Sequence, residues 1–232
     1  MTRHITYGEA IREGLDQSMA EDESVIVFGL DVDDPKRILG TTNELLEKYG
    51  PERLFGTPLS EDAMTGAAIG MAMAGLRPVH VHIRMDFLML AMNQLVNIAA
   101  KARYMTGGQL SVPLVVRSII GKSWGQGAQH SQSLYSMFMH IPGLKVVQPY
   151  SAADAKGLLK SAIRDPNPVI FLENEILYGQ SFDVPDLPDY TVPLGKARIW
   201  REGNDITLVS FGIGMKYALQ AADKLVEMGV SV

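Results

Sequence analysis

The sequence predicts a three-layer α/β fold, in which helices cover both faces of a mostly parallel sheet. Segments with helical periodicity alternate along the chain with short β-branched runs, such as residues 112–117 and 169–173. These runs lack the polar alternation of a sheet with one solvated face, which favours burial on both sides. Hydrophobic residues make up 47% of the 232 positions and charged residues 20%, which excludes a largely disordered chain.

The charge balance and the missing cysteines narrow the function classes. There are 21 Lys and Arg against 26 Asp and Glu, with no basic run, which argues against binding to nucleic acid or anionic lipid. The absence of cysteine excludes disulfides, thiolate zinc sites and cysteine nucleophiles, and it fits a cytoplasmic protein. Uncharged stretches such as residues 63–76 are too short for a bilayer span, which needs about 18 residues.

Helix and strand signals alternate in the first half of the chain. Thr6 and Glu9 form a capping box that begins a helix running to about Met19. Further signals predict a strand over 24–30, a helix over 42–49 closed by Gly50, a loop over 51–60, a helix over 62–74, and a strand over 78–84.

The same alternation continues in the second half. The patterns predict a long apolar helix over 86–105, a strand over 112–117, a glycine loop over 118–129, a helix over 130–139, a strand over 144–147, a capped helix over 151–164 and a strand over 169–173. Each helix therefore connects two strands, as a parallel sheet requires.

A proline-rich segment predicts a domain boundary. Residues 179–194 read as an extended linker between a first domain, 1–178, and a final unit, 195–232. The final unit shows signals for a strand pair over 197–211 and a helix over 215–228. Because a domain usually has about 100 to 150 residues, we expect this unit to be the truncated start of a second α/β domain.

Glu61 is the acidic residue with the most telling surroundings. A glutamate in the first turn of a helix is commonly explained by the helix dipole alone. Here Leu59, Ala63 and Met64 predict an apolar environment, which would raise the pKa of the carboxyl and make it a usable proton donor near neutral pH.

Three other groups of residues have competing interpretations. His80 and His82 face one side of a predicted strand, where they could bind metal or make polar contacts beneath a cleft, although Arg84 on that face would repel a cation. Residues 121–125 (GKSWG) match a hydrolase nucleophile motif, but no acid lies between Ser123 and His130 or His140. Residues 212–218 match a dinucleotide fingerprint that a tight turn also explains.

Several motifs in order carry a family resemblance over essentially the whole chain. They are residues 55–61 (FGTPLSE), 72–78 (AMAGLRP), 127–133 (GAQHSQS), 140–147 (HIPGLKVV) and 154–159 (DAKGLL). With them the chain resembles the beta subunit of the thiamine-diphosphate-dependent first component of 2-oxo acid dehydrogenase complexes, with its transketolase-like pyrimidine-binding domain.

The resemblance implies a role for five residues. Glu61 would hydrogen-bond a pyrimidine nitrogen of thiamine diphosphate and so favour the imino tautomer that activates the cofactor. Leu59, Ile83 and Phe87 would line the pyrimidine pocket, with Phe87 on the ring. His130 would face the substrate and handle proton or acyl transfer. Core packing for the three apolar residues, and a loop-ordering hydrogen bond for His130, are the alternatives.

The resemblance also implies metals and partners. A structural potassium ion would be held by oxygens of Leu114, Ala162, Ile163, Asp165 and Asn167. The sequence contains no Gly-Asp-Gly, the family's motif for magnesium and diphosphate. An alpha subunit would therefore carry that site in an α2β2 assembly, and a lipoyl-bearing acyltransferase would accept the acyl group.

Departures from the family pattern bear on the substrate. Leu30 and Leu90 stand where polar residues are common, and Arg84 replaces a small polar residue. We expect Arg84 and Lys122 to bind an anionic substrate, because a guanidinium suits a carboxylate. An acetoin-cleaving or transketolase-like relative is an alternative enzyme, and a non-catalytic interaction subunit is an alternative of another class.

Overall fold

Six parallel strands form the central sheet of the computed structural model, which describes residues 1–121 and 125–232. The spatial order of the strands is β3-β2-β4-β5-β7-β6. Their bounds are β2 Val25–Gly29, β3 Leu54–Gly56, β4 Arg77–His82, β5 Val115–Ile120, β6 Lys145–Val147 and β7 Val169–Asn174. The predicted parallel α/β sheet is confirmed.

Alternate residues of one strand reach two different hydrophobic layers. Val25 and Val27 of β2 pack into one core, whereas Ile26 and Phe28 pack into the other. Successive side chains of a strand point to opposite faces, so this division places a core on each side of the sheet. The arrangement explains why the strands are apolar at every position.

Different helices cover the two faces. The first core contains residues of α1 (Tyr7–Glu21) and α7 (Ala152–Arg164). The second contains residues of α3 (Glu61–Met73), α4 (Met85–Leu88) and α6 (Tyr135–Met139). The three layers predicted from the sequence are therefore present.

Capping boxes begin both helices of the first layer. The Thr6 side chain accepts a hydrogen bond from the Glu9 amide at 3.2 Å, and the Glu9 carboxylate accepts one from the Thr6 amide at 2.8 Å. Ser151 and Asp154 form the same arrangement at the start of α7. The capping box predicted at Thr6 is confirmed.

The long helix expected over 86–105 is helical but not uniform. It consists of α4, the 3₁₀ turn η1 (Met89–Ala91), the π-helical η2 (Asn93–Ala99) and α5 (Ala100–Met105). The helices expected over 42–49 and 130–139 are shorter, as α2 (Leu45–Tyr49) and α6. Apolar periodicity predicts that a segment is helical, but it does not fix the number of residues per turn.

Three strands were not predicted. Edge strand β3 lies in the expected loop over 51–60 and is only three residues long. β1 (Thr2–Thr6) and β8 (Ser181–Pro185) pair antiparallel and join the two ends of the first 185 residues. β8 lies within the segment read as a linker, where its terminal Pro185 is tolerated because the strand is at an edge.

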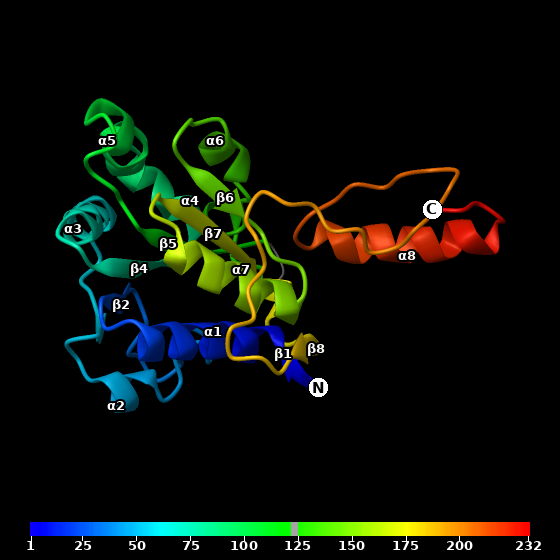
Figure 1. Cartoon of the computed structure of the whole chain (residues 1–232), viewed down its shortest axis with the longest axis horizontal. Helices are drawn as coiled ribbons and strands as arrows, with labels where there is room; N and C mark the ends of the chain where they lie inside the picture. The colour runs from blue at the N-terminus through cyan, green and yellow to red at the C-terminus, as the bar shows by residue number, and fades with distance from the viewer. Residues whose placement is uncertain (122–124) are drawn as a thin grey trace.

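The strand pair expected over 197–211 does not form. That segment has no regular secondary structure, and α8 (Gly214–Glu227) follows it, extending away from the sheet (Figure 1). Val209 and Phe211 are 90% and 50% exposed. Because an isolated two-stranded hairpin is marginally stable at best, β-branched residues alone do not make strands here.

Candidate cofactor-binding edge of the sheet

Loops leaving β3, β4 and β5 start from the carboxyl ends of these parallel strands, which together form the carboxyl edge of the sheet. In the parallel register, Gly29 of β2 is aligned with Gly56 of β3 and with Val81 of β4. The carboxyl ends of these strands therefore lie together, and the segments that follow them leave from the same side. In open α/β sheets this edge is where ligands bind.

Glu61 stands at this edge as the first residue of α3. Its side chain is half-buried, and it follows β3 by a short turn. Burial lowers the pKa of His82 at the end of β4, and the negative charge of Glu61 opposes that shift. The carboxylate and the end of β4 are therefore within electrostatic reach of each other.

The apolar environment expected around Glu61 is not formed within the chain. Leu59 is 75% exposed, and Ala63 is also exposed. Leu59 precedes α3 and Ala63 lies in its first turn, whereas the buried face of the helix carries Ala68, Ile69 and Ala72. Leu59 and Ala63 face outward and Met64 is only half-buried, so full apolar cover of Glu61 would require another molecule.

Phe87 and His130 meet although 43 positions separate them. Their ring centroids are 5.1 Å apart and the ring planes are inclined by 71°. Phe87 is in α4, and His130 ends the 3₁₀ turn η3 (Ala128–His130). Both rings are half-buried, as is Ile83 just after β4. The structure thus brings Phe87 and His130 together, two residues predicted for the site, while Ile83 lies four residues before Phe87, directly after β4.

Arg84 is held inside the protein. Its Nη1 donates to Glu175 Oε2 at 2.5 Å and its Nη2 to the Gly121 carbonyl at 2.5 Å. The side chains of Arg84 and Glu175 are 5% and 2% exposed. The guanidinium therefore already has a carboxylate partner, which argues against direct substrate binding by Arg84. Lys122, its expected companion, lies outside the described residues.

Sequence reasoning missed Asp86 and Glu175 as members of the site. Asp86 accepts a hydrogen bond from the Gln132 amide at 3.0 Å, two residues after His130. Aspartate and glutamate are almost never fully buried unless paired, so both needed a cationic partner. That Arg84 is this partner depends on contacts between β4, β5 and β7 that spacing along the chain does not reveal.

His80 and His82 lie beneath the site. They are 2% and 1% exposed, and their rings meet edge to face with centroids 5.5 Å apart. His80 also stacks on Phe28 at 4.9 Å. Across the described ranges no cluster of three or more possible metal-ligating side chains occurs, so the metal interpretation of the pair gains no third ligand.

The residues expected to hold potassium form an oxygen-rich turn at the end of α7. The carbonyls of Leu114, Ala162 and Ile163 accept hydrogen bonds from Val169, Asp165 and Arg77 at 2.8, 3.2 and 2.9 Å. Asp165 Oδ1 accepts from the backbone and side-chain nitrogens of Asn167. Each carbonyl has a second lone pair that suits a hard cation, whereas the Asp165 carboxylate is already paired with the Lys145 ammonium.

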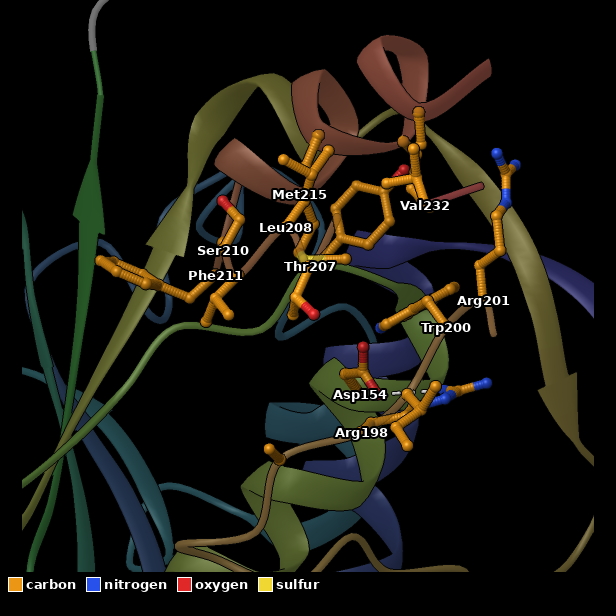
Figure 2. Close-up of a pocket in the computed structure, with 18 of the residues that line it drawn as sticks. Asp154, Arg198, Trp200, Arg201, Thr207, Leu208, Ser210, Phe211, Met215 and Val232 are labelled. Carbon is orange, nitrogen blue, oxygen red and sulfur yellow. Dashed lines mark hydrogen bonds and ion pairs between the residues drawn. The ribbon is translucent and has the colours of Figure 1, made fainter. Parts of the chain in front are cut away.

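A cavity of about 600 Å³ lies elsewhere, between α7 and the segment before α8. Figure 2 shows Trp200, Leu208, Phe211 and Met215 around it, with Arg198 facing Asp154 at 3.5 Å. None of the site residues predicted within 1–121 and 125–232 lines this cavity. The sheet edge, which carries the titratable groups, is therefore the better candidate site.

Comparison with known families decides the relationship. The model of the transketolase pyrimidine-binding domain matches residues 3–180, and that of the transketolase C-terminal domain matches residues 195–232. The chain belongs to the transketolase pyrimidine-binding domain family. The resemblance found in the motifs is thereby confirmed.

Curated relatives within this family are beta subunits. The chain is 51% identical over 228 residues to the "Pyruvate dehydrogenase E1 component subunit beta" of Rhizobium meliloti, covering 98% of this chain and 50% of that protein. It is 48% identical over 221 residues to the same subunit of Rickettsia felis, covering 95% of this chain and 68% of that protein. The chain thus spans about half to two thirds of the length of these relatives.

A solved structure supports the fold. The chain superposes on a structure described as "Split gene transketolase, inactive beta4 tetramer" with a TM-score of 0.77, at 23% identity, over 97% of this chain and 68% of that one. At this identity the likeness concerns the fold alone. Within the described ranges, no helix is long and apolar enough to cross a membrane.

Proposed function

We propose that this pyrimidine-binding chain works as the beta subunit of a thiamine-diphosphate-dependent 2-oxo acid dehydrogenase. The observation that carries the proposal is the placement of Glu61 at the same sheet edge as the Phe87 and His130 rings. The family model over residues 3–180 and the beta-subunit relatives support it.

The chain's own side chains fit one half of a cofactor site. When bound, thiamine diphosphate supplies the nucleophile for decarboxylation, and the protein orients and tunes it. We assign to Glu61 a hydrogen bond to a pyrimidine nitrogen, through which the carboxyl shares a proton with the ring. Ile83, Phe87 and the exposed Leu59 provide apolar surface for that ring. To His130, whose ring contacts Phe87, we assign the exchange of a proton with the substrate.

The rest of the site belongs in our proposal to an alpha partner. The exposed Leu59 is apolar surface that this partner would cover. The sequence has no Gly-Asp-Gly, so the partner would hold magnesium and the diphosphate in an α2β2 assembly. A lipoyl-bearing acyltransferase would take the acyl group. The potassium ion at the Leu114 and Asp165 turn, and a cytoplasmic location, stay predictions.

The experiment is reconstitution of turnover. The full chain is purified together with its alpha partner, and decarboxylation of a series of 2-oxo acids is followed with an artificial electron acceptor in place of the lipoyl domain. Carbon dioxide release that requires both subunits, thiamine diphosphate and magnesium supports the proposal. An assembled complex that binds the cofactor but turns over none of the acids would contradict the enzymatic role.

A further inference from the structure

We propose that Asp86 is a positioning residue that, backed by Arg84, fixes the His130 segment against Phe87. The inference rests on the proposed function, because it assigns the means by which one of its expected catalytic groups is held. It differs from the sequence-based expectation, in which Arg84 contacts the substrate directly.

A hydrogen bond joins the segment that carries Phe87 to the segment that carries His130. Asp86 immediately precedes Phe87 in α4, and its Oδ1 accepts from the backbone amide of Gln132 at 3.0 Å. Gln132 follows His130 by two residues. One hydrogen bond therefore fixes the distance between the chain segment that carries Phe87 and the one that carries His130.

Arg84 forms an ion pair with Asp86. Arg84 Nε lies 3.7 Å from Asp86 Oδ2, while the other guanidinium nitrogens contact Glu175 and the Gly121 carbonyl. The Asp86 side chain is only 2% exposed. A buried carboxylate needs a cationic partner, so Arg84 both neutralises Asp86 and links it to Gly121, just after β5, and to η4 (Glu175–Leu177).

The segment before His130 has little regular structure of its own. Residues 125–129 are exposed, and Gly125 and Gly127 have φ values of 65° and 76°, which other residues rarely adopt. Regular structure there is limited to the three residues of η3. A segment with so little structure of its own depends on tertiary contacts for its position, and the Asp86 bond is such a contact.

The test measures this contact directly, in the complex with the alpha partner. Hydrogen–deuterium exchange of the peptide containing Gln132 is compared in wild type, Asp86→Ala and Asp86→Asn. Loss of a hydrogen bond to a charged acceptor is expected to speed exchange about tenfold or more in Asp86→Ala. Asp86→Asn keeps the Oδ1 acceptor and should restore most of the protection.

A matched control lies just before β2, at the amino ends of the strands. Asp22 Oδ1 also accepts a backbone amide hydrogen bond, from Ser24 at 2.8 Å. Asp22→Ala should leave exchange at Gln132 unchanged. If Asp86→Ala fails to fold, Asp86→Ser replaces it. The serine hydroxyl is one bond too short to reach the Gln132 amide, so that amide should exchange faster in Asp86→Ser than in Asp86→Asn.

Kinetics separate positioning from general stability. Asp86→Ala should lower kcat about ten- to hundredfold, since misplacing a reacting group by about 1 Å costs that much, with cofactor affinity changed less than about threefold. Unchanged exchange in a folded Asp86→Ala or Asp86→Ser protein would overturn the inference. Failure of the wild-type complex to bind thiamine diphosphate would instead refute the proposed function and leave the exchange result standing.

Discussion

The rings of Phe87 and His130 meet edge to face with centroids 5.1 Å apart, and the backbone that follows His130 is hydrogen-bonded to Asp86, the neighbour of Phe87. This relationship joins the two loops at the carboxyl edge of the sheet. It also places an imidazole beside an aromatic surface suited to a flat ring, which is the basis of the proposed site.

Replacement of His130 tests its proposed part in proton transfer. His130→Gln keeps a polar side chain but cannot carry the proton, so kcat in the assembled enzyme should fall about 10²- to 10⁴-fold. Binding of thiamine diphosphate, measured by titration, should stay near the wild-type value. His140→Gln, at an exposed histidine ten residues later, serves as control. Equal kcat values for both variants would remove His130 from the mechanism.

A buried ion pair links the neighbouring strands β5 and β7. Arg117 Nε lies 2.6 Å from Glu173 Oε1, and both side chains are 1% exposed. The Tyr178 hydroxyl donates to the same carboxylate. Burial raises the pKa of that hydroxyl well above its usual value, so it stays protonated and remains a donor.

Removing the cation of this pair should destabilise the fold strongly. Arg117→Met leaves Glu173 buried without its partner, and we expect the free energy of unfolding to drop by about 3–5 kcal/mol in urea denaturation. Arg201 forms an exposed pair with Asp223 at 2.6 Å, and Arg201→Met should cost less than about 1 kcal/mol. Similar losses in the two variants would show that burial does not set the strength of the pair.

The buried histidines predict a loss of stability in acid. Burial, with a smaller contribution from His82, lowers the pKa of His80 from 6.5 to about 3. The unfolded chain therefore takes up this proton as the pH falls below about 6.5, whereas the folded chain does not until about 3. Between these values the free energy of unfolding should fall by up to about 1.4 kcal/mol per pH unit.

His80→Phe isolates that contribution. A phenyl ring can keep the stacking on Phe28 but does not titrate, so the stability of this variant should depend less steeply on pH between about 6.5 and 3. His140→Phe makes the same change at an exposed position. The prediction is wrong if denaturation curves at several pH values give His80→Phe the wild-type slope.

Much of the fold was predictable because it follows from local signals. The capping box at Thr6 and Glu9 predicts the start of α1, and apolar runs predict β2, β4 and β7. β1 and β8 were missed because their pairing joins residues 2–6 to residues 181–185, a contact that neither segment signals by itself. The strand pair over 197–211 was predicted from β-branched residues, but strand propensity depends on context and the segment packs without regular secondary structure.

The candidate site was predictable only in part. Motif resemblance selected Glu61, Ile83, Phe87 and His130, and the structure brings the last two into ring contact. It could not show that Arg84 pairs with Glu175, because that contact joins the ends of different strands. The exposure of Leu59 was missed as well, since an apolar residue in a sequence does not reveal whether a partner covers it.

Calorimetric titration of thiamine diphosphate with magnesium, into the full chain assembled with the proposed alpha partner, tests whether this chain forms half of the cofactor site. We expect saturable binding that weakens at least about tenfold in Glu61→Ala, because the hydrogen bond to a charged group is lost. Asp62→Ala, at the exposed next residue of the same helix, should bind as wild type does. Absence of binding by a correctly assembled complex, or equal affinity in Glu61→Ala, would refute the proposed site.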